Sequence, residues 1–160
     1  MAQFEDIYIV GGVRTAIGDF GGALKGFYPS DLGGLVATEA LSRAGVAPAD
    51  VGHVVFGQVM PTSAKDAMLA RTIALNAGVP VEVPAMTLNR LCGSGIQAIV
   101  SSAQMMQLGE ATITLAGGAE SMSNVPYHDH GARWGVKMGN NTLVDALVQG
   151  LQDASGGYHM

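Results

Sequence analysis

The apolar positions of this sequence fall into short runs of strand length that are separated by longer stripes with helical spacing. Residues 7–10, 51–56, 85–91 and 112–115 form the short runs, and the first of them ends at two glycines. Apolar runs of this length, bounded by turn-forming residues, indicate buried strands. The sequence therefore predicts four strands.

Three helices are expected between these strands. Ser30 or Asp31 can cap the first helix, and Gly45 can end it. The apolar face of this first helix consists of Leu32, Leu35, Val36 and Ala40. The other two helices are predicted over residues 64–76 and 93–108. The resulting order, βαβαβαβ, predicts an α/β protein with a mostly parallel sheet and right-handed crossovers.

The third predicted helix is apolar on most of its sides. Its large or apolar residues are Ile96, Ala98, Ile99, Val100, Ala103, Met105, Met106 and Leu108. A helix without a polar face is normally buried all round. A single sheet with ordinary outer helices offers no such place, so this helix indicates a further layer of protein. Beyond Gly118 the regular pattern stops, and only a short helix over residues 141–149 is expected.

Composition narrows the partners that the chain can have. The 160 residues are enough for one domain with a core, and 48% of them are hydrophobic whereas only 13% are charged. So low a charge suggests that other protein covers part of the surface, either a partner chain, as in a homodimer or homotetramer, or a missing part of this chain. The net charge is −5 and no basic run occurs, which argues against nucleic acid as a partner.

The start of the chain is acidic and lacks the pattern of a signal peptide. Residues 91–109 carry no charge, but their serines and glutamines make the stretch too polar for a membrane span. The chain is therefore expected to be cytoplasmic and not to bind membranes. Its single cysteine allows no internal disulfide, which fits a reducing compartment.

Cys92 lies in a glycine-rich turn between the third predicted strand and the apolar helix. The start of a helix carries free N–H groups and a partial positive charge, and both favour a thiolate over a thiol. The neighbouring Gly93 and Gly95 leave room for a substrate to approach the sulfur. Cys92 is thus a candidate nucleophile, although a lone cysteine is also often a small buried hydrophobe.

Residues 88–99, Leu-Asn-Arg-Leu-Cys-Gly-Ser-Gly-Ile-Gln-Ala-Ile, closely resemble the acyl-enzyme segment of thiolases. Three further segments resemble thiolases in the same order: residues 13–22, residues 117–123 and Tyr158-His159-Met160. The likeness covers the whole chain. The chain departs from it at Arg90 and Gln97, where these proteins often have Gln and Arg respectively. Neither change affects the chemistry of the nucleophile, but both could alter local packing or a dimer contact.

The resemblance implies the N-terminal βαβαβαβ half of a five-layered αβαβα thiolase fold, whose middle layer would contain the apolar helix. It implies residues 1–120 as that half and residues 121–160 as the start of a loop region that covers coenzyme A. It also implies that Cys92 takes an acyl group from acyl-CoA, and that His159 and Met160 lie beside the bound substrate. No cofactor is implied besides the coenzyme A thioesters that serve as substrates.

Thiolases continue well beyond a position like Met160, and the resemblance places several catalytic parts there. These parts are the closing strand of the first half, a Gly-His-Pro histidine that activates the nucleophile, a second catalytic cysteine and an asparagine that helps to hold a water. The chain is therefore expected to be inactive alone. Acetyl-CoA acetyltransferase is the favoured activity, because Tyr158-His159-Met160 looks more like the short-chain enzymes.

Two alternatives stay open from the sequence. One is another condensing enzyme of the thiolase superfamily, such as a ketoacyl synthase, and the other is a non-catalytic truncated product. Other histidines carry little signal: His128 and His130 have no third metal ligand nearby, and His53 has no catalytic companion in the sequence. We expect no metal site.

Overall fold

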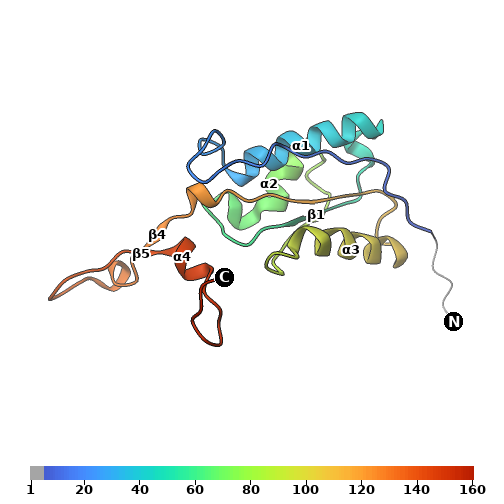
Figure 1. Ribbon diagram of the computed structural model, residues 1–160. Helices are drawn as coiled ribbons and strands as arrows, with labels where there is room; N and C mark the ends of the chain where they lie inside the picture. Colours follow the sequence, from blue (N-terminus) through green and yellow to red (C-terminus); the bar gives the residue numbers. More distant parts are fainter. Residues whose placement is uncertain (1–5) are drawn as a thin grey trace.

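A computed structural model describes residues 6–160 of the chain. Its main body has three layers, in which one helix covers one face of a small parallel sheet and two helices cover the other (Figure 1). The main strands and helices are α1 (Pro29–Ala44), β1 (His53–Gly57), α2 (Leu69–Asn76), β2 (Ala85–Leu88), α3 (Ser94–Gln107) and β3 (Thr114–Gly118). Short 3-10 turns cover Pro48–Asp50, Asp66–Met68, Met122–Asn124 and Ala132–Trp134. Among residues 6–160, every helix is too short or too polar to cross a bilayer.

The sheet has the strand order β2-β1-β3, and both pairings are parallel. Val54 of β1 lies beside Ala85 on one side and Leu115 on the other. All five residues of β1 are buried, which explains why this strand reads as a continuous apolar run. The α/β class and the parallel sheet predicted from the sequence are confirmed.

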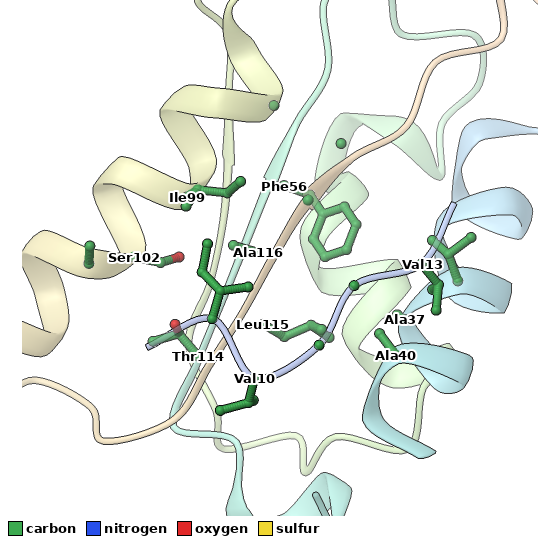
Figure 2. A pocket seen from close by; sticks show the side chains of 18 of the residues that line it. Val10, Val13, Ala37, Ala40, Phe56, Ile99, Ser102, Thr114, Leu115 and Ala116 are labelled. Carbon is green, nitrogen blue, oxygen red and sulfur yellow. The ribbon is translucent and has the colours of Figure 1, made fainter. Parts of the chain in front are cut away.

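The strand predicted at residues 7–10 is wrong. This segment is extended but belongs to no sheet, and Tyr8, Ile9 and Val10 are each about three-quarters exposed. A cavity of about 460 Å³ lies beside residues 7–10 and β3, and apolar side chains such as Ile99 and Ala37 line it (Figure 2). Both the segment and β3 line this cavity, and the two are not paired. An apolar pattern indicates an extended backbone but not which strand will pair with it.

Helix α1 differs in detail from its prediction. It begins at Pro29, with Tyr28 as the N-cap residue, and the Asp31 carboxylate accepts a hydrogen bond from the Tyr28 N–H at 3.1 Å. Leu35, expected on the apolar face, is largely exposed. The buried stripe is Gly33, Ala37 and Leu41 instead. Gly33 lies directly against Ile73 of α2. The two helices therefore contact each other through close approach of their backbones at Gly33, and not through a large side chain such as Leu35.

Helix α3 packs its small residues on the sheet and turns its large ones away. Its buried residues are Ser94, Ala98 and Ser102, spaced four apart along one face. Ile96 and Leu108 are 70% and 76% exposed, and Ile99 and Val100 are also exposed. The apolar outer face agrees with the further protein layer that the sequence predicts over this helix.

The last forty residues form a smaller unit with a hairpin-like pairing. Strands β4 (Tyr127–His128) and β5 (Val144–Asp145) pair antiparallel, and helix α4 (Ala146–Gly150) follows. The Asp145 carboxylate caps α4 by accepting from the Leu147 N–H at 2.9 Å. The helix begins at Ala146 and not at residue 141, because Val144 and Asp145 pair as β5 and Asp145 is the N-cap residue. Gly150 contacts Met60, which places α4 against the loop that follows β1.

Candidate active site

Cys92 lies in a tight turn between the end of β2 at Leu88 and the start of α3 at Ser94. The cysteine is exposed. The preceding residue, Leu91, has a φ of +50°, and among residues 6–160 it is the only one other than glycine in the left-handed region. This conformation costs a leucine roughly 1–2 kcal/mol, and such strain often occurs at functional sites. The turn resembles in kind the strained strand-to-helix elbows that project a nucleophile.

Several hydrogen bonds hold this turn. The Ser94 hydroxyl donates to the Leu91 carbonyl at 2.6 Å and accepts from the Arg90 N–H at 2.8 Å. The Asn89 side-chain carbonyl accepts from the Leu91 N–H at 2.9 Å. The Gly93 N–H donates to the Arg90 carbonyl at 3.1 Å. Together these bonds stabilise the left-handed Leu91 and fix where the Cys92 side chain leaves the backbone.

The turn lies at the carboxyl ends of β1 and β3 because glycine lets the start of α3 approach them. A Cβ at Gly57 would lie 2.7 Å from the backbone of Ser94, closer than real atoms come. A Cβ at Gly118 would lie 3.2 Å from the Gly57 carbonyl oxygen. Cys92 therefore stands at the edge of the sheet where ligands bind in parallel α/β proteins, beside the positive end of a helix.

Glu120, just beyond β3, is a half-buried carboxylate at the same end of the sheet. It accepts hydrogen bonds from the backbone N–H groups of Val59 at 2.9 Å and Met60 at 3.0 Å. Burial raises the pKa of Glu120, the two N–H groups oppose that rise, and the nearby Asp66 adds to it. A small hollow beside Glu120 is also lined by Arg14.

The segment after Glu120 joins this end of the sheet to the glycine-rich N-terminal loop. The Ser121 hydroxyl and the Asn124 amide both donate to the Phe27 carbonyl, at 3.1 and 2.9 Å. The Ser123 hydroxyl accepts from the Gly21 N–H at 2.9 Å. Segments 13–22 and 117–123, nearly a hundred residues apart in the chain, are thus held together.

His159 and Met160 lie in the exposed tail after α4. The tail folds back on itself: the Met160 N–H donates to the Leu151 carbonyl at 2.8 Å, and His159 bridges to Gln152. Through Gly150 and Met60 the tail is tied to the loop that follows β1. Within residues 6–160, no hydrogen bond joins either residue to Cys92, so their role beside substrate stays a prediction.

The remaining histidines are not brought together with Cys92. His53 opens β1, at the opposite end of that strand from the Gly57–Ser94 contact. The rings of His128 and His130 lie edge to face with centroids 6.1 Å apart, both exposed. Within the part of the chain that the structure describes, no group of three His, Cys, Asp or Glu side chains could hold a metal.

Three residues of the site were not singled out as functional from the sequence. Asn89 supports Leu91, Glu120 holds the loop after β1, and Arg90 donates a hydrogen bond to the side chain of Gln97. All three lie inside the segments that resemble thiolases. Their positions were visible in the sequence, but the contacts depend on how the segments meet in space.

Comparison with known proteins supports this assignment of segments. Residues 7–160 match the family model described as "Thiolase, N-terminal domain". The chain belongs to the thiolase family. It is 53% identical over 156 residues to beta-ketothiolase BktB of Cupriavidus necator, covering 98% of this chain and 40% of that protein.

Solved thiolase structures agree in fold. The Bacillus anthracis acetyl-CoA acetyltransferase superposes with a TM-score of 0.89 at 40% identity, over 94% of this chain and 38% of the other. Human mitochondrial 3-ketoacyl-CoA thiolase in complex with CoA gives 0.87 at 43% identity, over 90% and 37%. The thiolase chain described here thus spans about two-fifths of the length of its curated relatives.

Proposed function

We propose that the whole protein containing this chain is a thiolase that forms or cleaves 3-ketoacyl-CoA, with Cys92 as the acyl carrier. The observation that carries the proposal is the turn around Cys92. Leu91 is held in a left-handed conformation, which presents an exposed cysteine at the start of a fourteen-residue helix. Relatives named acetyl-CoA acetyltransferase and 3-ketoacyl-CoA thiolase support the same chemistry.

The proposed reaction has two steps. The Cys92 sulfur attacks the thioester carbonyl of acetyl-CoA, a new carbon–sulfur bond forms, and coenzyme A leaves as a thiol after taking up a proton. A second acetyl-CoA then loses a proton from its methyl group, and the resulting carbanion attacks the acetyl carbonyl. Acetoacetyl-CoA is released and the Cys92 thiolate is regenerated. The positive end of α3 favours the anionic sulfur in both steps.

Further features of the proposal rest on the family resemblance. His159 and Met160 border the acyl and pantetheine parts of the substrate, and residues 121–160 begin the region that covers coenzyme A. The base that accepts the methyl proton and the second cysteine lie beyond residue 160. The protein is a cytoplasmic homodimer or homotetramer, and the apolar outer face of α3 is covered by the rest of its own subunit.

The test is cleavage of acetoacetyl-CoA by the full-length protein and two variants. Cys92→Ala removes the nucleophile and should abolish turnover. Cys92→Ser should leave very little activity, because an alkoxide forms far less readily than a thiolate. Glu39→Gln, on the exposed side of α1, serves as the control and should keep wild-type turnover. Substantial activity in Cys92→Ala would refute the proposal.

A further inference from the structure

The backbone after β1 is held through both of the peptide groups that flank Val59. Its N–H donates to one oxygen of Glu120 at 2.9 Å, and its carbonyl accepts from the Asn89 side-chain amide at 3.4 Å. The other oxygen of Glu120 takes the Met60 N–H at 3.0 Å. Glu120 thus fixes this loop with both oxygens, from a position 61 residues away in the chain.

Asn89 continues the connection to the nucleophile turn. While its amide nitrogen donates to Val59, its amide oxygen accepts from the Leu91 N–H at 2.9 Å. Leu91 is the strained residue that immediately precedes Cys92. The contacts therefore run without a break from the Glu120 carboxylate, through the peptide group that joins Val59 to Met60 and the Asn89 side chain, to Leu91.

We propose that Glu120 is a positioning residue for Cys92, acting through Val59 and Asn89 to keep Leu91 in the conformation that aims the sulfur at substrate. The inference rests on the proposed function of Cys92 as acyl carrier. It gives a role to the Gly-Gly-Ala-Glu-Ser-Met-Ser segment, which the reaction itself does not otherwise use.

A carboxylate suits this position better than its neutral analogue. Its two oxygens both accept, so it matches two adjacent backbone N–H groups. Glutamine has one accepting oxygen, and its NH₂ group would face the second N–H as donor against donor. With Glu120→Gln, one of the two N–H groups loses its partner, and the peptide group that joins Val59 to Met60, whose carbonyl holds Asn89, is less firmly fixed. Asn89 then loses its acceptor, and the left-handed Leu91 loses part of its support.

The experiment measures single-turnover acetylation of Cys92 in the full-length protein, over a range of acetyl-CoA concentrations. Glu120→Gln should lower the maximal acetylation rate by about tenfold, because a slightly misplaced nucleophile reacts far more slowly. The acetyl-CoA concentration for half-maximal rate should change less than about twofold, since no substrate contact is removed. Glu39→Gln is the matched control and should acetylate at the wild-type rate, because Glu39 pairs with the exposed Arg43 within α1.

A double-mutant cycle tests the path itself. Asn89→Ala removes both of that residue's contacts, so it should also slow acetylation. If Glu120 acts through Asn89, the double variant should be no slower than Asn89→Ala alone. Multiplying losses in the double variant would overturn the proposal, as would wild-type acetylation in either single variant. If Glu120→Gln does not fold, Asn89→Ala alone still tests the step from Asn89 to Leu91, because wild-type acetylation in that variant would overturn the proposal.

The outcomes separate this inference from the function on which it rests. Failure of the wild-type protein to acetylate at Cys92 would refute the proposed function. Normal acetylation in both the wild type and Glu120→Gln would leave that function standing and refute only the role of Glu120. A loss of apparent affinity for acetyl-CoA, with the maximal rate unchanged, would also contradict positioning.

Discussion

The guanidinium of Arg90, in the nucleophile turn, donates a hydrogen bond to the side-chain oxygen of Gln97 in α3. These are the two positions at which the sequence departs from the expected thiolase pattern. The structure shows that the two side chains contact each other directly.

The Arg90–Gln97 contact predicts strong coupling between the two positions. Gln97→Arg alone would place two guanidinium groups together and should destabilise the protein by about 0.2–1 kcal/mol, the range for exposed charge contacts. The exchange Arg90→Gln with Gln97→Arg restores a bonded pair and should be close to wild type. Chemical unfolding of the four proteins measures the cycle, and purely additive effects would contradict the coupling.

Gly57 should tolerate no side chain. A Cβ there would lie 2.7 Å from the Ser94 backbone, so Gly57→Ala must push α3 away from β1. We expect a loss of about 1–3 kcal/mol in unfolding free energy and slower acetylation of Cys92. Gly26→Ala is the control, because nothing lies within 4 Å of its added Cβ. Equal stability of the two variants would show that α3 does not need this close approach.

Residues 1–160 expressed alone should aggregate, or form a compact state that binds apolar dyes, with negligible thiolase activity. Ile96 and Leu108 project from α3, and burying one such side chain contributes about 1.5–3 kcal/mol. The edge of β3 also faces a cavity rather than a paired strand. Light scattering and thermal unfolding test this expectation. A monodisperse chain with a cooperative transition would contradict it, whereas Ile96→Gln with Leu108→Gln should reduce dye binding.

The raised pKa of Glu120 predicts the direction in which the stability of the protein changes with pH. Burial raises its pKa above the ordinary 4.5, so the folded protein holds this proton more tightly than the unfolded chain. Its contribution to stability is therefore present below pH 4.5 and is lost as pH rises through the folded-state pKa. We therefore expect the difference in melting temperature, wild type minus Glu120→Gln, to decrease as the pH rises from 4.5 through the folded-state pKa. A difference that rises with pH would mean that the hydrogen bonds to Val59 and Met60 outweigh burial.

Sequence periodicity located α2, α3 and the three paired strands because each contains a cluster of apolar residues with turn residues at its ends, whether or not those residues are buried within residues 6–160. The same reasoning misplaced residues 7–10, since an extended apolar segment looks alike whether or not a strand lies beside it. It also favoured Leu35 over Gly33 on α1, because hydrophobicity does not register a contact made by close backbone approach.

The residues of the candidate site likewise include some that the sequence could predict and some that it could not. Cys92 was predictable because a cysteine between a strand and a helix, among glycines, is a local signal. The strained Leu91, Asn89 and Glu120 were not, because their contacts join β2, the loop after β1 and the end of β3. Such contacts arise only when the sheet brings its carboxyl ends together.

The most direct test of the account is to incubate the full-length protein with acetyl-CoA alone and map the modified peptide by mass spectrometry. We expect one acetyl group on the peptide that contains Cys92, and its release on addition of coenzyme A. The Cys92→Ala variant should acquire none. Stable acetylation at another residue, with the Cys92 thiol left free, would contradict the central claim.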